Sequence, residues 1–324
     1  MSDTQSPHLV IAFARCAGQG WQETMQNLPA GSLKNLRQLM QGMKGIENDR
    51  GDAFSLSPPH ERVQAKALGL GGDGALADGL IPWAAQEAGD TQGRAWAWVT
   101  PCHWAMGREH ATLTDTALLG LTPDESSTLR AAMQPYFETE GITLHPARAA
   151  GSERWLAEGD VFRHLPTASL DRVLGRNVDA WLPDSKTAPS LRRLQNEMQM
   201  LLYTHPLNDA RSARGLPTVN SFWLSGTGAL PSTRSTSAQD VNLARHLAQP
   251  AFSDDWVAYG LAWGQLDATL IAGHLARQSA GESVRLTLCG ECHAQTFETT
   301  RHGLLTRISR FLSPQPALQL LQQL

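Results

Sequence analysis

The sequence predicts an α/β protein in which helices cover a β-sheet. Buried strands are predicted at residues 8–14 (HLVIAFA) and 95–100 (AWAWVT), because each is a nearly continuous apolar run of strand length. A helix is predicted at residues 191–203, where leucines and methionines recur every three or four positions and polar residues occupy the opposite face. Strands that alternate with helices along a chain are typical of an α/β sheet covered by helices.

Local signals place two further helices. The Ser32 hydroxyl can cap a helix whose apolar face starts at Leu33. Residues 122–125 (TPDE) have the chemistry of a capping box with proline at the first helical position, so a helix starts there. We expect that helix to run to Gln134 and to end before Pro135, since proline interrupts helical hydrogen bonding.

A β-hairpin is predicted near the end of the chain. Residues 283–289 and 292–300 form its two strands, and Gly290 and Glu291 form its turn. The other expected elements are a polar, turn-rich loop at 44–60, a short helix at 61–68, and strands at 142–145 and 154–158.

Bulk properties exclude two classes of partner. The 324 residues carry a net charge of −4, and no segment concentrates Lys and Arg, so we expect no nucleic-acid partner. The apolar run at residues 9–14 is too short to cross a membrane and lacks a basic flank, so we expect neither a membrane partner nor a secretory signal. Four cysteines without an export signal predict reduced thiols and a cytoplasmic location. We expect one α/β unit over residues 1–324, with an inserted subdomain at about 115–200 and a mobile loop at about 231–239.

Two motifs have a structural interpretation. The glycine-rich residues 69–79 match neither phosphate-binding pattern, GxxxxGK[ST] or GxGxxG, and are typical of an ordinary loop. The CGECH run at residues 289–293 matches the short pattern for c-type haem attachment. That attachment follows export, and a second CxxC for a zinc site is missing, so we expect no haem and interpret the run as the hairpin turn.

Cys102, His103 and His110 are the first candidate site. They follow the buried strand at 95–100, and α/β proteins place functional groups beyond the carboxyl ends of strands. The three side chains could ligate a single divalent metal, or His103 could activate a substrate hydroxyl with Asp171 or Asp115 as partner. The catalytic candidates are therefore His103, His110 and Asp171. The alternative is a packed turn in which both histidines bond to the backbone.

A second polar segment extends from residue 162 to residue 184. It is dense in hydrogen-bonding groups, and its Arg172 and Arg176 could clamp a phosphate or a carboxylate. Equally, Asp171, Arg172 and Arg176 could be surface charges on one helical turn, and the sequence leaves both readings open.

Residues 194–228 carry a family resemblance. The chain has His-Pro-x-Asn-x-x-Arg, then Pro-x-x-Asn, then a strand that ends in Gly-x-Gly. The matching positions are His205, Pro206, Asn208, Arg211, Pro217, Asn220, Trp223, Gly226 and Gly228. This pattern resembles the archaeal-type, cofactor-independent phosphoglycerate mutases of the alkaline phosphatase superfamily. The resemblance implies a helix-covered, mostly parallel sheet, and it makes Asn208, Arg211, Asn220 and Trp223 candidates for substrate binding beside Arg172 and Arg176.

Over its whole length the chain also resembles an uncharacterised proteobacterial family. Its members are labelled either phosphoglycerate mutase or regulatory protein of the regulation-of-pathogenicity-factor E type. The motifs TPCHW, TASLDRV, LRRLQNEMQMLLYTHP and VNSFW carry this resemblance.

The departures from the mutases concern the metal ligands. In those enzymes the first strand ends in a metal-binding Asp-Gly, whereas here it ends in Phe13, Ala14, Arg15 and Cys16. The later Asp-His pairs and the Asp-x-x-Gly-His run are absent, and Ser225 replaces a phosphate-binding arginine. Two divalent metals need such carboxylates to offset their mutual repulsion. We therefore expect a non-catalytic regulatory or binding protein, whose partner is a small phosphorylated or carboxylated molecule or a regulatory protein. The alternative is a divergent hydrolase or phosphotransfer enzyme that uses Cys102, His103 and His110.

Overall fold

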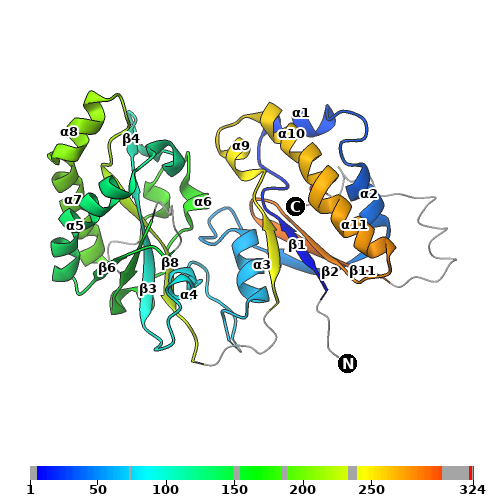
Figure 1. The fold of residues 1–324 in the computed structure, drawn as a ribbon, viewed down its shortest axis with the longest axis horizontal. Helices are drawn as coiled ribbons and strands as arrows, with labels where there is room; N and C mark the ends of the chain where they lie inside the picture. Colours follow the sequence, from blue (N-terminus) through cyan, green and yellow to red (C-terminus); the bar gives the residue numbers. More distant parts are fainter. Residues whose placement is uncertain are drawn as a thin grey trace. The chain divides into compact units, whose positions relative to one another are not determined.

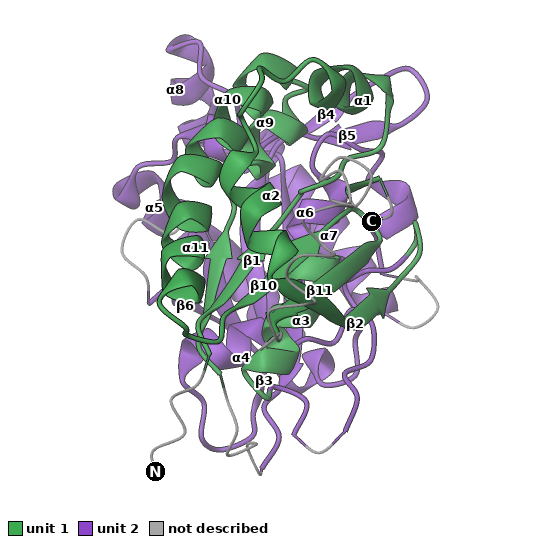
Figure 2. Cartoon of the chain, turned by 90° about the vertical axis from the view of Figure 1, so that its right-hand side faces the viewer, with its two compact units in different colours: residues 1–54, 58–69, 236–324 green, residues 55–57, 70–235 purple. Residues whose placement is uncertain are grey.

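The computed structural model describes residues 6–72, 74–148, 154–183, 188–232, 239–300, 321, 322 and 324. Their contacts divide the chain into two compact units (Figure 2). Unit 1 consists of Met1–Phe54, Pro58–Gly69 and Thr236–Leu324, and unit 2 of Ser55–Ser57 and Leu70–Ser235. The segment 115–200, expected as an inserted subdomain, lies inside unit 2, and its own boundaries stay a prediction. The expected mobile loop at 231–239 falls mostly on residues 233–238, which lie outside the described residues.

Unit 1 contains five strands, which are β1 (His8–Ile11), β2 (Met43–Arg50), β9 (Val241–Ala244), β10 (Arg285–Cys289) and β11 (His293–Thr299) (Figure 1). Its helices are α1 (Gln19–Gln26), α2 (Lys34–Gln41), α3 (Pro59–Ala67), α9 (Ala248–Phe252), α10 (Trp256–Leu266), the π-helical segment η4 (Asp267–Ile271) and α11 (Ala272–Ser279).

The sheet of unit 1 is mixed, with the order β2-β11-β10-β1-β9. Strand β1 pairs in parallel with β10 and β9, so that His8 lies opposite both Arg285 and Val241. Strand β11 pairs antiparallel with β10 and with β2, which confirms the predicted hairpin. The expectation of a mostly parallel sheet is wrong. Strand β2 was predicted as a loop because it is an edge strand, and edge strands with exposed side chains show no apolar alternation.

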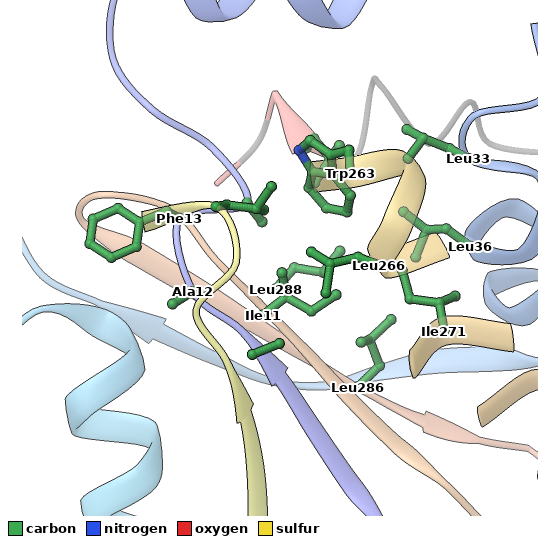
Figure 3. Packing of buried hydrophobic residues seen from close by; sticks show 14 of the residues in the cluster. Ile11, Ala12, Phe13, Leu33, Leu36, Trp263, Leu266, Ile271, Leu286 and Leu288 are labelled. Atoms are coloured by element: carbon green, nitrogen blue, oxygen red, sulfur yellow. The ribbon is translucent and has the colours of Figure 1, made fainter. Parts of the chain in front are cut away.

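One face of this sheet carries the main core of unit 1. Leu9 and Ile11 of β1 point to the same face as Leu286 and Leu288 of β10, because side chains alternate along a strand. Figure 3 shows Ile11, Leu286 and Leu288 packed beneath Trp263 and Leu266 of α10. Each buried leucine contributes about 1.5–3 kcal/mol through removal of its surface from water. Strands β1 and β10, both in the interior of the sheet, therefore supply the floor of this core.

Unit 2 has its own sheet, which is antiparallel throughout and has the order β6-β7-β3-β8. Its strands are β3 (Ala95–Cys102), β6 (Thr143–Pro146), β7 (Trp155–Glu158) and β8 (Ser221–Ala229), and a separate hairpin pairs β4 (Trp104–Met106) with β5 (Ala111–Leu113). Its helices are α4 (Trp83–Ala88), η1 (Thr116–Leu119), α5 (Pro123–Thr139), η2 (Asp160–Phe162), α6 (Leu170–Val173), η3 (Asp179–Trp181), α7 (Pro189–Tyr203) and α8 (Pro206–Ala213). Helices α5 and α7 pack on one face of the sheet, through Phe137, Leu194 and Phe222.

Helix α5 starts as predicted but ends later. Thr122 and Glu125 form the full capping box. The helix continues through Pro135 to Thr139, so the predicted end at Gln134 is wrong. Proline removes one helical hydrogen bond, but the buried positions Met133 and Phe137 on either side of it hold the helix against the core.

Helix α2 has an unexpected cap. It begins at Lys34, and its N-cap residue, Leu33, has a side chain that cannot cap the helix by a hydrogen bond. Instead, the buried Asp267 carboxylate of η4 accepts the backbone N–H groups of Asn35 and Leu36 at 3.0 and 2.8 Å. A negative charge is favourable at a helix N-terminus, so this contact ties α2 to the junction of α10 and α11. In the described residues, no helix has the length and apolar character needed to span a membrane.

Candidate functional site

The structure separates the three candidate ligands Cys102, His103 and His110. Cys102 ends β3 and is fully buried, and burial raises the pKa of its thiol, so the thiol stays protonated. His103 is half-buried, and its Nδ1 lies 2.8 Å from the carbonyl oxygen of Thr218, which fixes the proton on Nδ1. His110 is exposed in the β4–β5 turn. In the described part of the chain, the ligand atoms of these three residues do not gather within 4.8 Å of one another. The expected common metal site is not formed, because successive strand residues point to opposite sides.

Differences in cysteine burial lead to a first prediction. Cys16, Cys102 and Cys289 are buried, and burial raises the pKa of both the Cys102 and the Cys289 thiol, whereas Cys292 is half-exposed. The thiolate is the reactive form, so iodoacetamide should label Cys292 at least about tenfold faster than Cys102 in the native protein at pH 8. Peptide mass spectrometry of a time course measures both rates, and the difference should vanish in denaturant. Equal native rates would contradict the buried position of Cys102.

The two asparagines of the resemblance motif bridge backbone groups. The Asn208 side chain donates to the carbonyl oxygens of Leu202 and Val219, both at 2.7 Å, and accepts the N–H of Val219 at 2.9 Å. The Asn220 side chain accepts the N–H of Trp104 at 2.7 Å and donates to the carbonyl oxygen of the same residue at 2.9 Å. These amides join α7, α8 and β4 to the start of β8, so their hydrogen bonds serve the fold.

Arg211 and Trp223 are likewise bound to the protein itself. The fully buried Arg211 guanidinium donates to the carbonyl oxygens of Pro217 and Leu119 and to the carboxylate of Glu125 at 2.7 Å. The Trp223 indole is buried and donates to the carbonyl oxygen of Ala168 at 3.0 Å. These donors already have acceptors, and a role for either residue in substrate binding stays a prediction.

The second polar segment lies around α6. Arg172 is buried, donates to the carbonyl oxygen of Ser55 at 2.7 Å, and lies 5.2 Å from the ring centre of Trp181. Arg176 is exposed three residues beyond the helix, and Asp171 is half-buried within it. Asp115, the other proposed partner of His103, caps η1 by accepting the N–H of Ala117 at 3.0 Å. Arg172 is thus the buried arginine of this group, and one of its partners is a backbone carbonyl.

The carboxyl end of β1 is the part of unit 1 where the mutase resemblance implies a metal ligand. Phe13, which follows the strand, has a left-handed backbone conformation with φ of 58°, which is unusual for a bulky residue. The buried Tyr259 hydroxyl donates to the Phe13 carbonyl oxygen at 2.7 Å and holds this turn. The Phe13 ring packs 5.3 Å from the His60 ring and 4.9 Å from the Phe252 ring. An apolar ring therefore occupies the end of this strand, as Figure 3 shows.

The parallel strands β1, β9 and β10 end in turns that do not fit a two-metal site. Residues 12–16, 245–247 and 290–292 contain a single carboxylate, Glu291, which accepts the N–H of Ala17 at 2.8 Å. The same turns carry Arg15, Arg245 and His246. Two divalent cations require several anionic ligands, and three cationic or neutral nitrogen groups in these turns cannot supply them.

The sequence analysis missed the residues that shape this turn. Tyr259 and Phe252 follow β9, more than 200 positions after Phe13, and nothing in the local sequence connects them. The position of Arg245 directly after a short apolar strand could have identified it as a candidate, because functional groups often follow the carboxyl ends of strands. It donates to Nε2 of His60 at 3.2 Å, so His60 holds its proton on Nδ1 in that contact.

Comparisons with known proteins give only distant similarity. No protein-family model matches the sequence, and no curated protein matches it. The cofactor-independent phosphoglycerate mutase from Thermoplasma acidophilum aligns with 94% of this chain and 95% of its own, at 14% identity and a TM-score of 0.35. The PH0037 protein from Pyrococcus horikoshii aligns with 94% of this chain and 92% of its own, at 12% identity and a TM-score of 0.45. The chain is thus distantly similar in structure to cofactor-independent phosphoglycerate mutase.

Proposed function

We propose that this protein is a phosphoglycerate mutase-like protein without two-metal chemistry, which acts by binding a small phosphorylated or carboxylated molecule. One observation carries the proposal: the turns after β1, β9 and β10 hold a single carboxylate, and the Phe13 ring occupies the carboxyl end of β1. A two-metal phosphotransfer reaction needs anionic ligands that hold both cations on either side of the reacting oxygen atoms.

The chemistry of the same turns favours an anionic ligand. Arg15, Arg245 and His246 are groups that bind phosphate or carboxylate directly, and arginine does so through two parallel hydrogen bonds. A positively charged edge would attract such a molecule without any metal. A regulatory role, in which the bound molecule controls a protein partner, is compatible with this chemistry and stays a prediction.

Metal content and turnover test the proposal. The purified protein should contain less than about one-tenth of a divalent ion per chain by plasma mass spectrometry, because two-metal sites need carboxylates that these turns lack. It should convert neither 2- to 3-phosphoglycerate nor an aryl phosphate above the blank when Mn²⁺ or Mg²⁺ is added. Turnover that a chelator abolishes would contradict the proposal.

One variant separates the alternative enzyme from the binding protein. His103→Ala should leave metal content and activity unchanged, since the structure does not join His103 to Cys102 and His110. A divalent ion that is present in the parent protein and lost in His103→Ala would support the divergent hydrolase instead. His145→Ala is the matched control, because His145 is a half-exposed histidine of the same unit outside this region.

A further inference from the structure

The second face of the sheet in unit 1 carries a polar row. Strand alternation places His8 of β1 and Thr287 of β10 opposite the leucine-rich face, and Thr296 pairs with Thr287 across β10 and β11. All three residues are buried, with His8 only 7% exposed. Burial of a polar side chain is energetically unfavourable unless the side chain is hydrogen-bonded. The hydrogen-bond partners of these three residues therefore show whether any polar group is left to bind a ligand.

These side chains form a chain of hydrogen bonds with one end open. The Thr287 hydroxyl lies 2.8 Å from His8 Nε2 and 2.8 Å from the Thr296 hydroxyl. If Nε2 donated, the hydrogen of Thr296 would find no acceptor in the described residues. Both hydroxyl hydrogens have an acceptor when Thr296 donates to the Thr287 oxygen and Thr287 donates to His8 Nε2. Nε2 then carries no proton, so the ring proton lies on Nδ1. That Nδ1 is buried and has no partner among the described residues.

A cleft of about 290 Å³ lies over this polar row, within unit 1. Helix α3 packs on this face, against β1, β2, β9 and β11 (Figure 1). The cleft is lined by His8 and Thr296 from the row, by Arg62 and Lys66 from α3, and by Glu47, Asp49, Gln239 and Arg285 among others. Its volume is close to the lower end of small-molecule sites.

Ion pairs fix the walls of this cleft. Arg62 binds Asp49 at 2.5 Å, and Lys66 contacts Glu47. Arg285 binds Glu298 and Gln239, both at 2.9 Å. Each of the three cations that line the cleft is therefore paired with a carboxylate, and the Glu298 partner of Arg285 lies just outside the lining.

The His8 ring at the base of the cleft is uncharged at neutral pH. Burial, and then the charge of Arg285, lower the pKa of His8 to about 4, even though Glu47 acts in the opposite direction. The neutral ring offers a single N–H next to Arg285, which lies opposite His8 in the sheet. Such a donor is best completed by an anionic oxygen, because hydrogen bonds to charged acceptors are the stronger ones.

We infer that this cleft is the ligand site of the protein and binds a small molecule through one carboxylate or phosphate, whose oxygen accepts from His8 Nδ1 beside Arg285. The inference rests on the binding function proposed above, but it places the ligand at the amino-terminal ends of β1 and β10 and not at the arginine-bearing turns of their carboxyl ends. The neutral and acidic groups on the walls, Gln239, Glu47 and Asp49, would face the hydroxyl or amino groups of the same molecule.

Calorimetric titration with three probes tests the site and its ligand chemistry. The probes are 3-phosphoglycerate, glycerol 3-phosphate and glycerate, which carry both anionic groups, the phosphate alone and the carboxylate alone. We expect at least one of them to bind the full chain, and the two single-anion probes show which group the cleft prefers. Absence of binding by all three would overturn the inference.

Paired substitutions at His8 test the hydrogen bond itself. His8→Gln places its amide near the former Nε2 and should keep the Thr287 contact but lose the donor, so affinity should fall about 10- to 100-fold. His8→Asn places its amide near Nδ1 and should bind more tightly than His8→Gln. Nitrogen-15 NMR of the ring should also show the Nδ1-protonated tautomer in the parent protein and a shift of that signal with the probe. A fold-only role for His8 would give equal affinities and no shift.

Arginine variants separate failure of the site from failure of the function. Arg285→Gln should weaken binding about tenfold or more, whereas Arg277→Gln, an exposed arginine of the same unit paired with Glu282 at 3.3 Å, should leave it unchanged. Binding that survives His8→Gln and Arg285→Gln but is lost in Arg245→Gln would place the ligand at the strand-end turns. That result would overturn this inference and leave the proposed function standing, while metal-dependent turnover would overturn the proposed function alone.

Discussion

Replacing Arg211 by methionine is expected to destabilise unit 2 by about 3–5 kcal/mol, because it leaves a paired carboxylate without its buried partner. The Arg211 side chain is fully buried and joins α8 to Glu125 in the capping box of α5. Burial acts to raise the pKa of Glu125, but the Thr122 N–H, Arg214 and Arg211 together hold it below its usual range. The carboxylate is therefore charged at neutral pH in the parent protein, and the variant removes one of the groups that stabilise this charge.

The measurement is hydrogen exchange of peptides from α5, α8 and β8 together with denaturant unfolding. Arg214→Met is the matched control, since Arg214 binds the same carboxylate at 2.5 Å but is 53% exposed. Exposed ion pairs contribute little, so this control should cost at most about 1 kcal/mol. Similar losses in both variants would contradict the buried network that the structure shows.

Replacing Asp267 by alanine is expected to destabilise unit 1 by about 3 kcal/mol. The variant removes two hydrogen bonds from backbone N–H groups to a buried carboxylate, and each such bond to a charged group contributes about 1.5–3 kcal/mol. It also removes a negative charge from the N-terminus of α2. Amide exchange at Asn35 and Leu36 should accelerate first, ahead of the strands of the sheet.

An ordinary helix cap in the same unit provides the comparison. The exposed Asp255 caps α10 by accepting the N–H of Ala258 at 2.9 Å, and its replacement by alanine should cost about 1 kcal/mol. If Asp267→Ala proves no more damaging than Asp255→Ala, then the contact between η4 and α2 does not hold unit 1 together.

Short-range signals predicted the parts of this fold that depend on neighbouring residues. The strand at 95–100, the helix at 191–203, the capping box and the terminal hairpin are all present, because apolar periodicity and cap chemistry are local. Apolar periodicity did not predict strand β2, because an exposed edge strand needs no apolar pattern. Pro135 does not end α5 as predicted, because tertiary packing of the helix outweighs one missing hydrogen bond.

The mixed sheet and the cleft could not be predicted in this way. Which strands pair depends on contacts between distant segments, and His8 meets Thr287 across 279 positions. His8 was read as the first residue of an apolar strand, and Thr287 as one position of a hairpin. The motif residues Asn208, Arg211 and Asn220 attracted attention as polar groups in a known pattern. Their side chains instead satisfy backbone groups, which is the usual fate of buried polar residues.

The order in which unit 1 is assembled from the chain has a consequence for its synthesis. Strand β1 leaves the ribosome before its neighbours β9 and β10, which are encoded more than 200 residues later. At about 5–20 residues per second, β1 waits roughly 10–60 s for both partners, with Leu9 and Ile11 still exposed to water. All of unit 2 except the three residues 55–57 is meanwhile made as one continuous stretch and can fold first. Unit 1 is therefore expected to complete its sheet only after the segment of unit 2 has been made.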